Sequence, residues 1–90
     1  MQKFMIERNI PAVGKLLPTE LREVARQSNS VLLELGPSVQ WVQSYITRDR
    51  MYCVYLAPDE ALVREHALRG GFPADQISRI TAVIDPTTAE

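Results

Sequence analysis

The sequence predicts an α+β fold in which an antiparallel four-stranded sheet carries two helices on one face. The chain has 90 residues, which suits a single domain spanning residues 1–90. Segments of alternating polarity, typical of strands, are interleaved with two segments that have helical periodicity. Their order along the chain is strand, helix, strand, strand, helix, strand, and this order predicts the fold class.

The N-terminal region predicts a strand followed by a long loop. In Lys3–Arg8 the apolar residues Phe4 and Ile6 alternate with their neighbours, which indicates a short strand. The following segment, Asn9–Pro18, contains two prolines and a glycine and predicts a loop. Because a loop of this length is unusual in a small domain, it is a candidate for a functional role.

The clearest helix is predicted over Thr19–Leu35. Thr19 is a suitable N-cap, and acidic residues in the first turn favour the positive end of the helix dipole. Residues at intervals of three and four form one largely apolar stripe, which predicts a face buried in the core: Leu21, Val24, Ala25, Ser28, Val31, Leu32 and Leu35. Gly36 and Pro37 end the helix.

Two adjacent segments, Gln40–Thr47 and Met51–Ala57, are rich in aromatic and β-branched residues and predict a β-hairpin. The register of this hairpin stays open. A two-residue loop pairs Tyr45 with Tyr52, whereas a three-residue loop pairs Tyr45 with Cys53.

The C-terminal third predicts a helix and a last strand. Pro58, Asp59 and Glu60 favour the start of a helix that runs to about Arg69, where two glycines end it. A last strand is predicted over Ser78–Ile84, followed by a polar tail. With right-handed crossovers, these elements form a ferredoxin-like βαββαβ fold.

The second face of this sheet has no covering layer within the chain, yet neither face of the hairpin is polar. Simple alternation groups the first strand into Trp41, Gln43 and Tyr45 against Val42, Ser44 and Ile46. It groups the second strand into Met51, Cys53 and Tyr55 against Tyr52, Val54 and Leu56. An exposed apolar and aromatic face usually marks an association surface. We therefore expect a homodimer in which two sheets pack face to face as a dimeric α+β barrel.

Composition excludes several classes of function. Ten basic and eleven acidic residues give a net charge of -1, which argues against a nucleic-acid binder that relies on bulk charge. No apolar run approaches the ~18 residues of a membrane span, and an early charge argues against a signal peptide. The single cysteine, Cys53, excludes an internal disulfide framework and is expected to be a buried apolar residue. We expect a cytoplasmic protein.

His66 and Glu7 are the residues most able to carry chemistry. His66 is the only histidine, and the helical wheel turns it inward. It is either a core histidine, bonded to Ser44 or a tyrosine hydroxyl, or a metal ligand or proton-transfer group. Glu7 is either a carboxylate at a strand end that reaches water or a group that needs a partner. One histidine and one cysteine make a tetrahedral zinc site improbable, whereas an octahedral divalent ion accepts mixed imidazole, carboxylate, tyrosine and water ligands.

The sequence also resembles a family of small bacterial proteins described as nickel-binding or nickel-responsive and formerly classed as of unknown function. The resemblance lies in MQKFMIERNIP at the N-terminus, QWVQSYITRDRMYCVYLAPD in the hairpin, EHA in the second helix and GGFPADQI after it. It implies a ferredoxin-like fold, homodimerisation through the sheets, a cytoplasmic location and an octahedral Ni²⁺ ion. At the matched positions it implies His66 as the first ligand candidate, Glu7 as the second and Tyr45 as a supporting group.

The leading hypothesis is therefore a non-enzymatic homodimer that binds nickel or a similar divalent metal, for sequestration or response. The alternative is a cofactor-independent enzyme of the dimeric α+β barrel type, resembling monooxygenases that act on aromatic substrates, with His66 as general base in an aromatic pocket. A third possibility is an interaction module in which His66 is merely structural.

Overall fold

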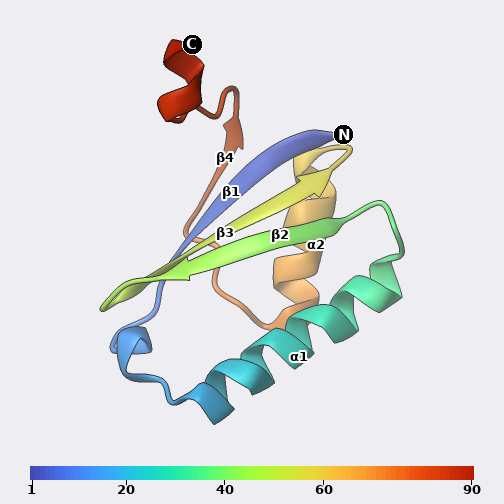
Figure 1. The fold of residues 1–90 in the computed structure, drawn as a ribbon. Coiled ribbons are helices and arrows are strands. Elements are labelled where there is room, and N and C mark those ends of the chain that lie inside the picture. The colour runs from blue at the N-terminus through green and yellow to red at the C-terminus, as the bar shows by residue number, and fades with distance from the viewer.

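The computed structural model describes residues 1–90 and has the ferredoxin-like arrangement (Figure 1). The four strands form one antiparallel sheet in the order β2-β3-β1-β4. The strands are β1 (Gln2–Asn9), β2 (Gln40–Ile46), β3 (Arg50–Ala57) and β4 (Gln76–Ile80). The helices are α1 (Pro18–Leu35) and α2 (Glu60–Gly70), with short 3₁₀ turns at Val13–Lys15 and Pro86–Ala89.

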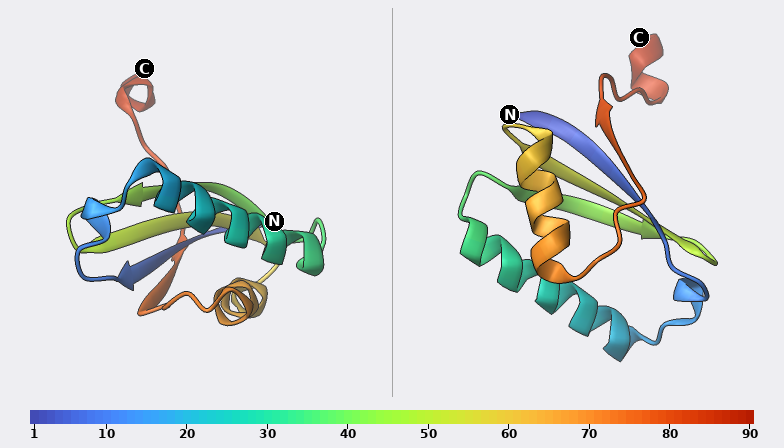
Figure 2. Two further views of the ribbon diagram at one scale, coloured as in Figure 1. Left: turned by 90° about the horizontal axis from the view of Figure 1, so that it is seen from below. Right: turned by 180° about the vertical axis from the view of Figure 1, so that it is seen from behind.

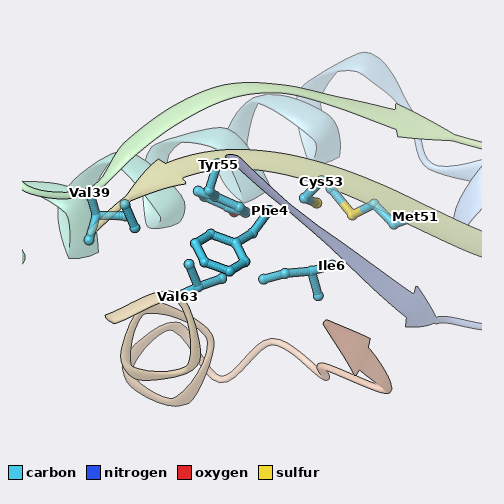
Figure 3. Packing of buried hydrophobic residues seen from close by; sticks show 8 residues of the cluster. Phe4, Ile6, Val39, Met51, Cys53, Tyr55 and Val63 are labelled. Atoms are coloured by element: carbon cyan, nitrogen blue, oxygen red, sulfur yellow. The ribbon is translucent and has the colours of Figure 1, made fainter. Parts of the chain in front are cut away.

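The hydrophobic core lies between the sheet and the two helices, which cover the same face (Figure 2). Figure 3 shows Phe4 and Ile6 of β1 and Tyr55 of β3 pointing toward Val63 of α2. All four of these side chains are buried. The opposite face of the sheet carries no helix, and the C-terminal segment after β4 extends away from the sheet (Figure 1).

The long N-terminal loop is anchored to the hairpin rather than free. Gly14 donates its backbone N–H to the Arg48 carbonyl at 3.0 Å, and Ala12 donates to the Asp49 carboxylate at 2.9 Å. A Cβ atom on Gly14 would lie 2.8 Å from the Thr47 carbonyl oxygen, so this position requires glycine for the close approach of the two segments.

Helix α1 begins one residue earlier than predicted, and the prediction that Thr19 is its N-cap is wrong. Leu17 is the cap residue, and its N–H donates to the Glu20 carboxylate at 2.9 Å. Pro18 occupies the first turn, where the missing N–H costs no hydrogen bond. Neither this helix nor any other is long and apolar enough to cross a membrane.

The hairpin takes the register in which Tyr45 pairs with Tyr52, one of the two alternatives left open by the sequence. The predicted grouping of the β2 side chains is wrong in part, because a β-bulge at Val42 interrupts simple alternation. The bulge leaves Trp41 opposite Tyr55 but moves Ser44 to the helix-covered side, opposite Cys53. Trp41, Ser44 and Ile46 therefore share the helix-covered face, while Val42, Gln43 and Tyr45 lie on the other face.

Helix α2 has the predicted ends. Asp59 accepts a hydrogen bond from the Leu62 N–H at 3.1 Å as N-cap, and Gly71 ends the helix in the left-handed region with φ 69°. The predicted Ser78–Ile84 strand is wrong in position, since β4 spans Gln76–Ile80. Ile80 pairs with Lys3 near the start of β1, so residues beyond it have almost no neighbouring strand with which to pair.

Candidate functional site

The face of the sheet without helices presents Glu7 beside two tyrosines. Strand register places Glu7 opposite Tyr52, and Tyr52 opposite Tyr45, so the three side chains form one row across β1, β3 and β2. Glu7 is half-buried, and its carboxylate makes no ion pair or hydrogen bond with the protein. Tyr45 is 52% exposed, and its hydroxyl accepts a hydrogen bond from Gln43. This row combines an unpaired carboxylate with phenol groups.

Apolar side chains lie along one side of the row. Val42, at the bulge, is 48% exposed and lies on the same face as Met5 and Val54. A shallow hollow of about 300 Å³ lies here, bounded by these three residues, by Tyr45 and by the segment after β4. The uncovered face therefore carries exposed apolar and aromatic side chains together with polar ones such as Lys3 and Gln43.

His66 lies on the other side of the sheet and is completely buried. Its Nε2 is 3.1 Å from the Ser28 Oγ on α1, so the imidazole connects the two helices. Its ring lies 4.8 Å from the Tyr55 ring and 6.1 Å from the Phe72 ring, measured between centroids. The inward orientation predicted for His66 is confirmed, and its partner is Ser28 rather than Ser44 or a tyrosine hydroxyl. Its Nδ1 is buried and has no hydrogen-bond partner.

The surroundings of His66 keep it neutral. Burial lowers the pKa of His66 from its ordinary value of 6.5, and the positive charge of Arg8 lowers it further. Burial is also the main cause that raises the pKa of Tyr55 above its ordinary value. At neutral pH this cluster therefore contains an uncharged imidazole and a protonated phenol.

Arg8 is the functional candidate that sequence reasoning missed. Only 1% of its surface is exposed, and it forms no ion pair with any acidic residue. Its guanidinium donates to the Pro73 carbonyl at 2.6 Å, to the Tyr55 hydroxyl at 3.4 Å and to the Cys53 sulfur at 3.5 Å. The available signal was the two-residue period of β1, which places Arg8 on the same side as Phe4 and Ile6.

A pocket of about 190 Å³ lies between α1 and the sheet. Most of its lining is apolar, with Arg8, Ser28, Ser44 and Tyr55 as polar members and Trp41 as an aromatic wall. His66 does not line the pocket. The enzymatic alternative requires His66 to act as a base within reach of a ligand. The position of His66 outside the pocket does not favour this alternative.

The structure does not bring the three predicted metal-site residues together. Glu7 and Tyr45 share one face of the sheet, whereas His66 belongs to α2, which covers the other face. No group of three or more histidine, cysteine, aspartate or glutamate side chains in the chain could hold a metal ion. The physical reason is strand alternation, which turns Glu7 to the uncovered face and its neighbour Arg8 toward the helices. His66 comes from one of those helices and therefore cannot reach Glu7.

Residues 4–80 match a family model described as nickel responsive protein SCO4226-like. The chain belongs to this SCO4226-like family. The fold is similar to that of the crystal structure of SCO4226 from Streptomyces coelicolor A3(2), with a TM-score of 0.76. That similarity covers 91% of this chain and 99% of the SCO4226 chain at 18% sequence identity. A search of curated proteins finds no match.

Membership of the SCO4226-like family confirms the resemblance seen in the sequence and makes this a protein of a nickel-responsive family. The family match extends over nearly all of the regular structure, from Phe4 in β1 to Ile80 at the end of β4. It therefore includes the row on the uncovered face, the His66 cluster and the pocket.

Proposed function

We propose that this protein is a nickel-responsive homodimer that binds a divalent metal ion, Ni²⁺, at the uncovered face of its sheet. The observation that carries the proposal is the half-buried Glu7 carboxylate, which has no cation or hydrogen-bond donor from the protein and lies in a row with Tyr52 and Tyr45. A carboxylate that is partly removed from water favours a cationic partner.

One chain does not supply enough ligands for such an ion. The proposal therefore includes a dimer. Packing two copies through the uncovered face would add a second Glu7 and a second Tyr45. Water molecules are common further ligands of octahedral divalent ions. The bound ion would neutralise the carboxylates where the two sheets meet and so favour association. Metal binding and pairing would then be linked, which is the basis of a response to nickel.

His66 is assigned a structural role in this proposal. Its imidazole is neutral and has a free nitrogen, which are properties of a metal ligand. However, it is completely buried and bonded to Ser28, on the opposite side of the sheet from Glu7. We also propose a cytoplasmic location, since the one cysteine is a buried free thiol.

The test is a nickel titration of protein purified without a histidine tag and stripped with a chelator. We expect NiCl₂ to raise the melting temperature, because an ion at 100 times its Kd that binds only the folded state stabilises it by about 2.7 kcal/mol. Glu7→Gln keeps the shape of the side chain but removes its charge, and this variant is expected to lose the shift.

Two further variants make the result specific. Glu23→Gln is the matched control: it removes a carboxylate from the exposed surface of α1 and is expected to keep the full shift. His66→Gln distinguishes the two possible sites. If His66→Gln loses the nickel response while Glu7→Gln retains it, the ion binds in the interior and the proposed position is wrong. If the wild type shows no response, nickel binding by this chain is refuted.

A further inference from the structure

The buried Arg8 guanidinium carries an uncompensated positive charge inside the protein. Arginine stays protonated in proteins, so burial cannot neutralise it as it can a lysine or histidine. The three groups that accept its hydrogen bonds are a carbonyl, a hydroxyl and a sulfur, and none of them is an acid. The Phe72 ring, whose centroid lies 5.2 Å from the guanidinium carbon, adds only a weak cation–π attraction. Buried charges are normally paired, so an anionic group is the partner that the Arg8 guanidinium favours.

Arg8 also has hydrogen-bonding capacity to spare. A guanidinium has five N–H groups in a planar fork, and the contacts with Cys53, Pro73 and Tyr55 use one on each nitrogen. Two N–H groups therefore remain. The Tyr55 hydroxyl, which accepts from Arg8, also belongs to the lining of the pocket.

The pocket beside Arg8 fits a small ligand with an apolar body. Its volume of about 190 Å³ exceeds the ~150 Å³ that is enough for benzene and is smaller than the sites that hold drug-sized molecules. Leu21 and Val24 of α1 face Met51 across it, and the Trp41 indole provides a flat wall. The Trp41 ring is held in place by a hydrogen bond to Ser44 at 3.0 Å. Ile46, which is 38% exposed, shows that the lining reaches the surface.

We propose that this pocket binds a small aromatic monocarboxylate whose carboxylate pairs with Arg8 and whose ring packs against Trp41. The planar guanidinium matches a carboxylate with two parallel hydrogen bonds. The apolar lining selects a ligand with one charged end and an uncharged ring. This site is separate from the proposed metal site, because it lies on the opposite face of the sheet and uses neither Glu7 nor Tyr45.

Trp41 fluorescence provides a direct test, since Trp41 is the only tryptophan in the chain and lines the pocket. Chelator-treated wild-type protein is titrated with benzoate and, separately, with benzamide, which has nearly the same shape but no charge. We expect benzoate to produce a saturable change in emission and benzamide to bind at least ~10-fold more weakly, since charge pairing is central to the proposal. Working without metal makes the result independent of the nickel experiment.

Two variants test the assigned roles by different routes. Arg8→Gln removes the charge, and we expect its benzoate affinity to fall to that of benzamide. Ala25→Met fills the pocket from α1 while leaving Arg8 in place, and it is expected to lose both ligands. Ala25→Met also covers the case in which Arg8→Gln does not fold. The proposal is overturned if benzoate gives no saturable change in the wild type, if benzamide binds equally well, or if a folded variant binds benzoate normally.

Discussion

At the scale of single residues, three polar side chains are buried in the interior and link its elements by hydrogen bonds. Arg8, Ser28 and His66 are all buried, and each comes from a different element: β1, α1 and α2. His66 bonds to Ser28, and Arg8 bonds to the loop that follows α2. These contacts connect segments far apart in the chain. Removing one partner would leave another buried polar group without a hydrogen bond, so each position is sensitive to substitution.

The protonation of His66 gives a prediction at this scale. Because the chain has one histidine, its imidazole protons give a single NMR titration curve. We expect a pKa below the ordinary value of 6.5, since burial and the Arg8 charge both disfavour the imidazolium ion. Unfolding in urea should return the pKa to about that ordinary value. A pKa at or above 6.5 in the folded protein would contradict the placement of the ring.

The same shift predicts how stability depends on pH. Below the ordinary pKa of 6.5 the unfolded chain binds a proton that folded His66 does not. The stabilisation is therefore fully present above that pH and is lost as the pH falls toward the lowered pKa of the folded state. In this window the free energy of unfolding should decrease by up to about 1.4 kcal/mol per pH unit more than in His66→Gln. Urea unfolding at a series of pH values measures the difference, and parallel curves would refute it.

At the scale of elements, the N-cap of α2 and the bulge in β2 determine which side chains face the interior. The Asp59 cap starts α2 at Glu60, which sets the rotation that turns Val63 and His66 toward the sheet. On the exposed side, Glu65 pairs with Arg69 at 2.8 Å, as its spacing of four predicts. In β2, the extra residue at Val42 allows Trp41 and Ser44 to face the same pocket.

The cap of α2 can be tested by substitution. Asp59→Ala removes the acceptor for the Leu62 N–H, and we expect a loss of about 1 kcal/mol in the free energy of unfolding. For a domain of this size, that corresponds to a fall of about 4–8 °C in melting temperature. Asp59→Asn is the matched control, because it keeps an acceptor oxygen and remains a good cap. Equal melting temperatures for Asp59→Ala and the wild type would show that the cap has no energetic importance.

At the scale of the whole molecule, the two faces of the sheet have different environments. One face is covered by α1 and α2 and forms the core, whereas the other leaves Val42 and Tyr45 about half exposed. Val83 and Ile84, in the segment after β4, are also exposed. Exposed apolar groups that continue from a sheet face onto a neighbouring segment are typical of an association surface.

The proposed dimer predicts a specific effect of charge on this face. In analytical ultracentrifugation at micromolar concentration, we expect the wild type to sediment as a dimer. Val42→Asp should raise the dimer dissociation constant by at least ~10-fold, since each dimer would bury two added carboxylates. Leu33→Asp is the control, because Leu33 is 84% exposed on α1 and lies outside the proposed interface. Dissociation by Leu33→Asp alone, or a monomeric wild type, would refute pairing through the sheet.

The sequence by itself determined the order and type of the elements. Alternation predicted β1, periodicity predicted α1 and α2, and turn residues predicted the hairpin, because these signals act between residues that are close in the chain. The same local signals predicted that His66 faces inward. They predicted the position of β4 incorrectly, since the end of that strand depends on where its partner β1 begins.

Only the tertiary structure decided which side chains share a site. Glu7 and His66 both look like metal ligands in the sequence, but strand alternation and helix packing place them on opposite sides of the sheet. The hairpin register and the bulge at Val42 depend on pairing across strands, so no local pattern determines them. Burial of Arg8 likewise requires two helices to cover one face of the sheet. Contacts between distant segments are set by packing as a whole, and this is why the pocket could not be predicted from the chain.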